Sequence, residues 1–580
     1  MYKKLLQSVR EYKRPSLEAP FYVSLEVVME CIIPFIVARL VNSIREGSSF
    51  SVLMSYGVVL VVMACLSLTF GIIAGNACST ASCGFAKNLR SDIFRAVQGF
   101  SFENLNRFPT SSLVTRLTTD VSDVQQAYMM IVRTAIRGPL MLVFSFIMAL
   151  IMGGRIAFIF LFTAPFLGLG LFAIASWAMP TFRRLFREYD EFNNTVQENI
   201  QGIRAVKAFV REEYEKERFS RRNEAICRNF TRVERILALN NPMMQFCLYV
   251  VMIFVLYYGT YRAAVSHGLD IDVGQISSLL TYGMQILGSL MRLSMVFVMI
   301  TLARESAVRI VEVLEEVPAI PNPPDGLKEI PDGSVEFEGV SFSYSNTKSP
   351  CALTNITMKI PSGSTIGIIG ATGSSKTTLI QLIPRLYDAA SGSVKVGGHD
   401  VREYDIKALR SAVSLVLQKN EIFSGTVRDN LKWGDKNATD EEISEACRIS
   451  CCDEFIGRLP QGYDTFTEQS GTNFSGGQKQ RLCIARALLK RPKVLILDDA
   501  LSAVDTHTDA KIRRALKDYM PETTKIIIAQ RISSVEDADR IILMEGGRIR
   551  SSGTHRELME TDNVYREIYN SQNAGRNSDA

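Results

Sequence analysis

The sequence predicts an all-α transmembrane domain of six helices followed by an α/β domain. Three observations predict this fold class: six long apolar stretches in the first 300 residues, a cluster of prolines between 318 and 331, and short β-branched runs that alternate with amphipathic segments after it. The composition agrees, because 47% of the 580 residues are hydrophobic and 22% are charged. This balance is too apolar for an ordinary soluble protein and too charged for a chain that lies wholly in a membrane.

The six apolar stretches lie at about 19–44, 52–79, 132–152, 155–178, 243–266 and 273–303. Each is close to or above the ~20 residues that a helix needs to cross a bilayer. The third and fourth stretches are separated only by Gly153, Gly154 and Arg155. Because an arginine is costly inside the hydrocarbon layer, Arg155 is expected at the membrane surface.

The connections after the second and fourth stretches are long and rich in lysine and arginine, which predicts that they and both chain ends are cytoplasmic. Their composition is helical, so the spans are expected to continue beyond the membrane and to turn back near Pro109 and near residues 211–215. The segments 106–112 and 211–219 are expected to dock on α/β domains. The first 16 residues lack the apolar core of a cleavable signal and are expected to lie on the inner membrane surface.

The net charge indicates which partners to expect, and the proline cluster indicates where one domain ends and the next begins. The net charge is only +5 and is spread along the chain, so a nucleic acid is not an expected partner. The expected organisation is a transmembrane domain at 1–305, a linker at 306–333, an α/β domain at 334–570 and a disordered polar tail at 571–580.

A glycine-rich loop follows a buried strand expected at 365–369 and precedes an apolar helix. In this setting, which defines a P-loop, backbone N–H groups and the helix N-terminus face phosphates, Lys376 reaches the β and γ groups, and the Thr377 hydroxyl holds Mg²⁺. The sequence therefore predicts an α/β P-loop ATPase domain with ATP and Mg²⁺ as cofactors. The loop residues expected at ATP are Gly370, Thr372, Gly373, Ser374, Ser375, Lys376, Thr377 and Thr378.

A second buried strand at 494–497 leads into Asp498 and Asp499, at the end of the strand where parallel sheets place their ligands. Asp498 is the expected Mg²⁺ ligand. A third apolar run at 526–528 ends in Ala529 and Gln530. The segment Asn-Phe-Ser-Gly-Gly-Gln at 473–478 completes the set, and with it the chain resembles the ABC transporter family along essentially its whole length.

The resemblance implies further roles. Tyr344 corresponds to an aromatic residue that stacks on adenine, Gln418 to a glutamine that meets Mg²⁺, and Ser502 and Asp505 to a loop that crosses to a partner domain. In the family, two ATPase domains enclose two nucleotides, each between the P-loop of one chain and the signature of the other. The signature residues here are Ser475, Gly476, Gly477 and Gln478. The resemblance thus implies a dimer with a second half-transporter, in the cell's inner (plasma) membrane, with cytoplasmic ATPase domains.

Three residues depart from the family pattern. Ser375 replaces a glycine, Asp499 replaces a glutamate that polarises the attacking water, and Gln530 replaces a histidine. A displacement of about 1 Å can lower a rate about a hundredfold, and a glutamine carries no positive charge. All three lie in the chain's own P-loop half-site, whereas its signature is intact. The chain therefore resembles the degenerate-site subunit of heterodimeric bacterial exporters, with hydrolysis expected mainly at the site that the partner completes.

The expected function is export of hydrophobic or amphipathic molecules by ATP-driven alternating access. A nucleotide-gated channel, a regulatory subunit and a slow homodimeric exporter fit the same motifs. The cargo is not identified by the sequence, because multidrug, lipid and peptide export share this architecture.

Glu26 and Glu30 stand four residues apart on one face of the first span, and Arg292 in the last span is a possible partner for either. Carboxylates within a membrane are costly and usually line a cavity or serve function. The alternative is that Glu26 lies near the interface and extends its carboxylate to water. If both line the substrate cavity, the cavity is expected to prefer neutral or cationic amphipathic molecules.

Overall fold

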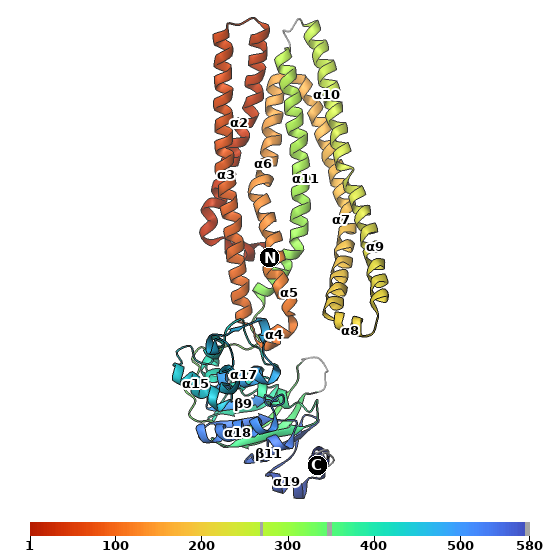
Figure 1. The fold of residues 1–580 in the computed structure, drawn as a ribbon. Helices are drawn as coiled ribbons and strands as arrows, with labels where there is room; N and C mark the ends of the chain where they lie inside the picture. Colours follow the sequence, from red (N-terminus) through yellow and green to blue (C-terminus); the bar gives the residue numbers. More distant parts are fainter. Residues whose placement is uncertain (267–270, 345–350, 575–580) are drawn as a thin grey trace. The chain divides into compact units, whose positions relative to one another are not determined.

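The computed structural model describes residues 1–266, 271–344 and 351–574. The chain divides into two compact units, one of residues 1–99 with 109–316 and one of residues 100–108 with 317–580 (Figure 1).

Six long apolar helices build the first unit, which confirms a helical transmembrane domain at the N-terminal side of a sheet-containing domain (Figure 1). They are α2 (Lys13–Arg45), α3 (Phe50–Gln98), α6 (Val121–Gly153), α7 (Phe158–Gln201), α10 (Asn240–Val265) and α11 (Val273–Glu315). Judged by length and composition, five continuous helical stretches of the described residues could cross a membrane, because the stretch 110–181 contains both α6 and α7. The two are joined by a short 3-10 turn, η3 (Gly154–Ala157), in which Gly154 has φ 47°.

The chain begins with α1 (Tyr2–Leu6), which contacts α11, and η1 (Gln7–Tyr12), which packs on α3. Ser8 Oγ donates to Asp92 Oδ2 (2.8 Å), and Arg10 forms an ion pair with the same carboxylate. These contacts fix the N-terminal segment on the first unit.

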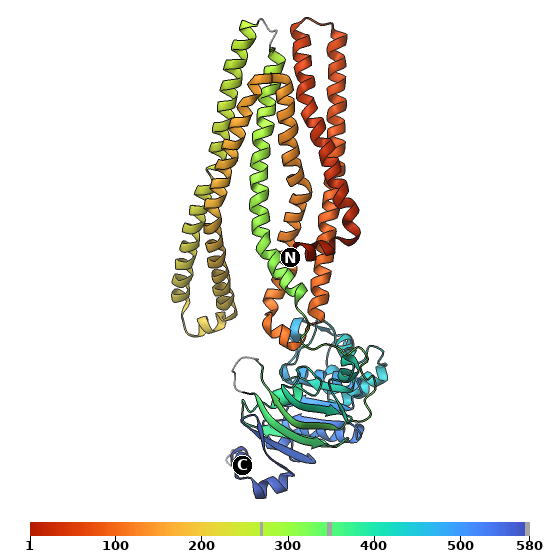
Figure 2. The same cartoon turned by 180° about the vertical axis from the view of Figure 1, so that it is seen from behind.

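The helices α7 and α9 (Glu212–Leu237) run side by side and are joined by the short helix α8 (Ile203–Ala208) (Figure 2). The turn of the second long connection therefore lies at 203–208, before the predicted residues 211–215. The glutamates of that acidic run occupy the first turn of α9 instead, where the helix dipole favours negative charge.

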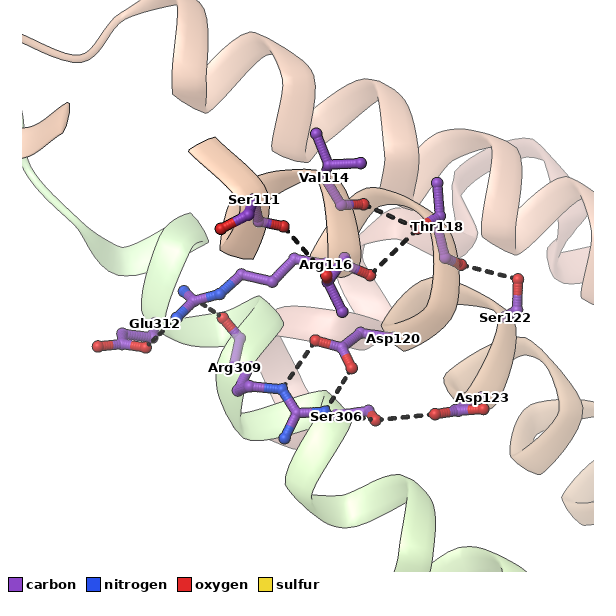
Figure 3. Close-up of polar contacts among 11 residues, drawn as sticks. Ser111, Val114, Arg116, Thr118, Asp120, Ser122, Asp123, Ser306, Arg309 and Glu312 are labelled. Atoms are coloured by element: carbon purple, nitrogen blue, oxygen red, sulfur yellow. Dashed lines mark hydrogen bonds and ion pairs between the residues drawn. The ribbon is translucent and has the colours of Figure 1, made fainter. Parts of the chain in front are cut away.

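A polar cluster fastens the last turns of α11 to the start of α6 (Figure 3). The cluster begins in α5 (Thr110–Thr115) and the π-helical turn η2 (Arg116–Asp120). Arg309 Nε donates to Asp120 Oδ2 (2.9 Å), and Arg116 Nη2 donates to Glu312 Oε2 (2.9 Å). The Asp120 side chain is only 1% exposed, and its ion pair with Arg309 offsets the cost of burying a carboxylate.

These contacts explain why α11 continues to Glu315, ten residues beyond the expected end of the transmembrane domain at 305. Ser306, Arg309 and Glu312 are spaced by three residues and therefore share one helix face, and each has a partner in the segment 116–123. Residues 306–315, expected in the linker, are helical because of this packing.

The short helix α4 (Phe102–Arg107) belongs to the second unit. Asn106 Nδ2 donates to the Tyr387 hydroxyl (3.1 Å), and the rings of Phe102 and Tyr387 lie 6.1 Å apart. Asn104 Nδ2 also donates to the carbonyl of Val317 (3.0 Å), at the start of the linker. The segment between α3 and α5 thus contacts the sheet-containing domain, and Asn106, one of its contact residues, lies in the predicted segment 106–112.

The second unit is built on a six-stranded sheet in the order β12-β11-β3-β10-β9-β6, in which only β12 is antiparallel to its neighbour. The strands are β3 (Thr365–Gly370), β6 (Val413–Val416), β9 (Val494–Asp498), β10 (Thr524–Ile528), β11 (Arg540–Glu545) and β12 (Arg548–Gly553). An antiparallel sheet, β2-β1-β4-β5, comprises β1 (Val335–Phe342), β2 (Leu353–Ile360), β4 (Ser391–Val396) and β5 (His399–Asp400). The short β7 (Gly425–Thr426) and β8 (Phe466–Thr467) pair with each other.

Nine further helices surround these sheets in the described part of the second unit: α12 (Lys376–Gln381), α13 (Ile406–Ala412), α14 (Val427–Leu431), α15 (Asp440–Ile449), α16 (Asp453–Ile456), α17 (Gly476–Leu489), α18 (Thr506–Tyr519), α19 (His555–Thr561) and α20 (Asn563–Ala574). The helix α20 extends into the expected disordered tail, so that expectation is wrong for residues 571–574. Residues 575–580 lie outside the described residues.

Candidate nucleotide-binding site

Three neighbouring parallel strands end at the same edge of the six-stranded sheet. In the register of the sheet, Ile528 of β10 lies opposite Ile368 of β3 on one side and opposite Asp498 of β9 on the other. The P-loop follows β3, Gln530 follows β10, and Asp499 follows β9. The sheet therefore brings together residues that are more than 100 positions apart in the sequence.

The P-loop runs from the end of β3 into α12. The Lys376 ammonium donates to the carbonyls of Gly370 (2.7 Å) and Ala371 (2.9 Å). Burial lowers the pKa of Lys376, and the nearby carboxylates of Asp498 and Asp499 oppose this shift. A cation held within a loop of backbone amides at a helix start is suited to phosphate groups.

The backbone of the loop has little room for side chains. Ser375, the residue before Lys376, has φ 67° and ψ 27°, a left-handed conformation that costs an L-residue about 1–2 kcal/mol and that glycine adopts freely. Gly373 also has a positive φ of 86°, and a Cβ on Gly370 would lie 2.3 Å from the Met544 carbonyl oxygen. In the same loop Thr372 is exposed and Ser374 is buried.

Tyr344 lies beside the P-loop helix, where its hydroxyl hydrogen-bonds to Thr378 Oγ1 (2.9 Å). Its ring meets Phe342 and Tyr387 edge-on, at 4.9 and 5.3 Å, and 49% of the residue is exposed. The ring is thus fixed by its edges next to α12, as a surface on which a planar base can stack.

Only one of the two carboxylate oxygens of the buried Asp498 accepts a hydrogen bond from a described residue. Its Oδ1 accepts a hydrogen bond from Thr377 Oγ1 (3.2 Å), whereas its buried Oδ2 has no hydrogen-bond partner among the described residues. Burial raises the pKa of the Asp498 carboxyl. A free oxygen beside a threonine hydroxyl suits a Mg²⁺ ion, which prefers such oxygen ligands.

Asp499 is held by the side chains around it. Gln530 Nε2 donates to Asp499 Oδ2 (2.8 Å), and the Gln418 side chain also hydrogen-bonds to this carboxylate. Asp499 has φ 51°, a left-handed conformation that aspartate tolerates better than most residues. Burial raises the pKa of Asp499, and these hydrogen bonds oppose the shift. The two sequence departures Asp499 and Gln530 are therefore in direct contact.

The signature residues form the start of α17. Ser475 Oγ accepts a hydrogen bond from the Gln478 N–H (3.4 Å), and Gln478 Oε1 accepts one from the Ser475 N–H (2.8 Å). This capping box leaves the other first N–H groups of the helix available to an anion. Gly477 packs so closely on the next loop that a Cβ would lie 2.8 Å from the Ala503 carbonyl oxygen, whereas Gly476 has more room.

The loop after Asp499 carries both predicted crossing residues. Ser502 Oγ donates to the Asp499 carbonyl (2.8 Å), and Asp505 caps α18 by accepting from the Thr508 N–H (2.9 Å). Ser502 and Asp505 are both exposed, in the loop that leads into α18.

Two glutamines were missed by the sequence analysis. Gln480 of α17 accepts from the Ala503 N–H (3.0 Å) and donates to Ser502 Oγ (3.3 Å), so it links the signature helix to the crossing loop. Gln572 of α20 donates to the Gln530 carbonyl (2.8 Å) and accepts from the Ile532 N–H (2.9 Å). No local pattern marks either residue, because each acts across more than 20 positions of sequence.

In the first unit, Glu26 and Glu30 share a partner that the sequence did not indicate. Arg137 of α6 donates through Nη1 to Glu26 Oε1 and through Nη2 to Glu30 Oε1, both at 2.6 Å. The suggestion that Arg292 pairs with them is wrong, because Arg292 is exposed and forms no ion pair among the described residues. The side chain of Glu26 is only 9% exposed, so it does not extend to water.

A P-loop at a parallel sheet edge, buried aspartates beside it and a glycine-rich helix start, in one chain with long apolar helices, define a membrane-bound P-loop ATPase. Family models agree: the model of the ABC transporter transmembrane region matches residues 20–290, and the ABC transporter model matches residues 353–502. The ABC transporter ATP-binding protein YfiB of Bacillus subtilis is 33% identical over 547 residues, covering 94% of each chain. The chain belongs to the ABC transporter family.

Other relatives refine the comparison. The ATP-dependent lipid A-core flippase of Desulfotalea psychrophila is 32% identical over 495 residues, covering 84% of each chain. A bacterial Atm1-family ABC exporter with ATP bound has the same fold, with a TM-score of 0.83 over 97% of this chain and 98% of that one, at 22% identity. The chain is thus a multi-pass membrane protein with the exporter fold and an ATPase domain, as in ATP-hydrolysing transporters.

Proposed function

We propose that this chain is one half of a heterodimeric exporter that moves hydrophobic or amphipathic molecules out of the cytoplasm by ATP-driven alternating access. The observation that carries the proposal is the hydrogen bond from Gln530 to Asp499 (2.8 Å). Asp499 and Gln530, which depart from the family pattern at catalytic positions, hydrogen-bond to each other. The signature side of the same unit, residues 475–478 at the start of α17, keeps its complete motif. The chain's own P-loop site then binds ATP and hydrolyses it poorly.

The residues of the P-loop side fit an ATP molecule with Mg²⁺. Lys376 and the loop amides would hold the phosphates, Tyr344 would support the base, and Thr377, Asp498 and Gln418 would hold the metal ion. Bound Mg²⁺ neutralises phosphate charge. Asp499 is one methylene shorter than glutamate, and its Oδ2 already accepts a hydrogen bond, so it is a weak candidate for activating water.

The signature side serves the partner in this proposal. Ser475 and the N–H groups at the start of α17 would contact the γ-phosphate of the nucleotide on the partner's P-loop. The loop with Ser502 and Asp505 would transmit the presence or absence of nucleotide at one site to the other site, because Gln480 links this loop to α17. The partner then supplies the glutamate and histidine that this chain lacks.

The proposed location is the inner (plasma) membrane, with both termini and the ATPase domain in the cytoplasm, as the basic long connections predict. An amphipathic, lipid-like substrate is supported by the relatives whose names describe lipid A-core flippases, from Desulfotalea psychrophila and Syntrophus aciditrophicus.

The proposal is tested by purifying the tagged chain from its native membranes and reconstituting the product in liposomes. A second, homologous chain is expected to co-purify in equal amount. In liposomes where the transporter's ATPase domains face outward, an amphipathic dye is expected to accumulate when ATP is added. A homodimer that hydrolyses ATP as fast as the mixed complex would contradict the division between the sites. ATP-dependent currents without accumulation would contradict export.

A further inference from the structure

A pocket of about 540 Å³ lies in the first unit between α2, α3 and α6, at the level of the predicted spans. Glu26 and Glu30 line it from α2, and Arg133 lines it from α6. The wall contributed by α3 is made of small and apolar side chains, among them Ala64 and Leu68. A pocket that combines opposite charges with an apolar wall is suited to an amphiphile.

The acidic side of the pocket has an unused acceptor. Arg137 satisfies Glu26 Oε1 and both oxygens of Glu30, but Glu26 Oε2 has no hydrogen-bond partner among the described residues. The Glu26 side chain is more than nine-tenths buried, and a buried carboxylate oxygen normally accepts at least one hydrogen bond. Gly71 of α3 faces this carboxylate, and a Cβ there would lie 3.2 Å from Oε1 and 3.8 Å from Oε2. The missing side chain leaves the acid within reach of the pocket.

The basic side of the pocket consists of Arg133, whose guanidinium group has no partner among the described residues. Arg133 is half-buried and makes no hydrogen bond or ion pair with any residue that the structure describes. It stands one helical turn before Arg137 on α6, so both guanidinium groups lie on one side of that helix. Arg292 of α11 does not line the pocket.

The charges therefore separate within the pocket. The two glutamates and Arg137 leave one net negative charge, and Arg133 adds one positive charge at a different place. Uncompensated charges are costly in a low-dielectric environment. A lone cation or a lone anion would compensate one side only, whereas a zwitterion would compensate both.

The apolar surface of α3 extends beyond the pocket. On α3, Val61, Leu68 and Ile72 are 64%, 65% and 54% exposed. In a multi-pass membrane protein, such a surface suits acyl chains, which can follow α3 while a headgroup occupies the pocket.

We propose that this pocket binds the headgroup of a zwitterionic amphiphile, with its ammonium group at Glu26 and Glu30 and its phosphate or carboxylate at Arg133. The proposal rests on the proposed function, because it assigns the substrate class of the exporter. It replaces the cation preference that the glutamates alone would predict. The two possible sources of this chemistry are a bilayer phospholipid and a zwitterionic small molecule.

The test uses the full complex in nanodiscs that contain equal amounts of phosphatidylethanolamine, phosphatidylcholine and phosphatidylglycerol. Lipids retained by the protein after delipidation are counted by native mass spectrometry. Phosphatidylethanolamine has an ammonium with N–H donors and a phosphate, so it should be retained about tenfold over phosphatidylglycerol, in line with a charged hydrogen bond. Phosphatidylcholine, which lacks N–H donors, should fall between them.

Three variants and a control connect the preference to the pocket. Arg133→Ala should lower the retention of all three lipids, because each of them carries the phosphate that Arg133 contacts. Glu26→Gln should reduce the preference to less than about twofold, because it removes the charged contact to the ammonium. Ala64→Phe should do the same by filling the pocket without touching the ion pairs, which keeps the test valid if Glu26→Gln misfolds. Arg39→Ala, which changes an exposed arginine of α2 outside the pocket, should preserve the preference.

A zwitterionic detergent added at the same molar ratio separates the two sources, because its competition without phosphatidylethanolamine retention would identify a small-molecule site. Equal retention of all three lipids without such competition, or a preference that persists in Ala64→Phe and Glu26→Gln, would overturn the proposal. ATP-driven dye transport measured on the same samples distinguishes this failure from failure of the proposed exporter function, since transport without headgroup preference rejects only the pocket assignment.

Discussion

The P-loop side and the signature side of the second unit differ in how their key residues are held. On the P-loop side, Ser375 and Asp499 have left-handed backbones, with φ of 67° and 51°, and the Asp499 carboxylate is occupied by Gln530. On the signature side, Ser475 and Gln478 cap each other, and Gly477 occupies a place where only glycine fits. The two sides therefore differ in their residues: the P-loop side holds left-handed residues other than glycine and a carboxylate that already accepts a hydrogen bond, whereas the signature side keeps its glycine and its capping pair.

The largest expected effect comes from damage to the signature side. Gly477→Asp would place a Cβ 2.8 Å from the Ala503 carbonyl oxygen and add a negative charge at a proposed phosphate contact. ATP turnover of the complex should fall about 10²- to 10³-fold, as when an oxyanion contact is lost. Steady-state phosphate release measures this. A loss of less than tenfold would place the productive site elsewhere.

Restoring the family residues should activate the P-loop side. In the Gly477→Asp background, Asp499→Glu combined with Gln530→His should raise the residual turnover about tenfold, because the longer carboxylate regains about 1 Å of reach. Single-turnover hydrolysis with radiolabelled ATP measures the gain. No gain, together with normal ATP binding, would show that the partner's signature rather than these two residues limits this site.

The strain at Ser375 predicts a smaller effect on affinity. Ser375→Gly removes a left-handed serine that costs about 1–2 kcal/mol and clears the approach of a phosphate, so ATP should bind several-fold more tightly. Binding of a fluorescent ATP analogue measures the change. Asn355→Gly is the matched control, because Asn355 also has a positive φ (50°) and lies outside the site. An equal gain in both variants would refer the effect to general stability.

The smallest expected effect concerns the C-terminal helix. Gln572→Ala removes hydrogen bonds to the Gln530 carbonyl and the Ile532 N–H, each contributing about 1 kcal/mol to the position of that loop. The rate constant for ATP turnover should change about two- to fivefold with little change in KM. Ser571→Ala, on the same helix, should leave it unchanged. An altered KM with a constant rate would argue against a positioning role.

Much of the fold and of the nucleotide site could be predicted because the information is local. The P-loop, the signature and the aspartates after β9 each lie in one short segment whose strand-to-helix context is visible in the sequence. The six apolar stretches likewise report burial in lipid through length alone. Where the sequence failed, the answer depended on which helix faces meet in three dimensions.

Arg137 is the clearest case. Both Arg137 and Arg292 lie in apolar spans, and no periodicity tells which of them faces Glu26 and Glu30. The end of α11 and the helical residues 571–574 depend in the same way on distant partners, Asp120 and Arg116 for the first and the Gln530 loop for the second. The turn at α8 was misplaced because the charges at 212–215 serve the start of α9.

The most direct test of the division between the two sides compares Lys376→Ala with Ser475→Ala by steady-state ATPase activity of the purified complex. Lys376 belongs to the site proposed to hydrolyse poorly, and Ser475 belongs to the site proposed to be productive. We predict a loss of about tenfold or less for Lys376→Ala and of about a hundredfold for Ser475→Ala. Equal losses, with nucleotide still bound at the partner's P-loop in the lysine variant, would contradict the proposed division of labour.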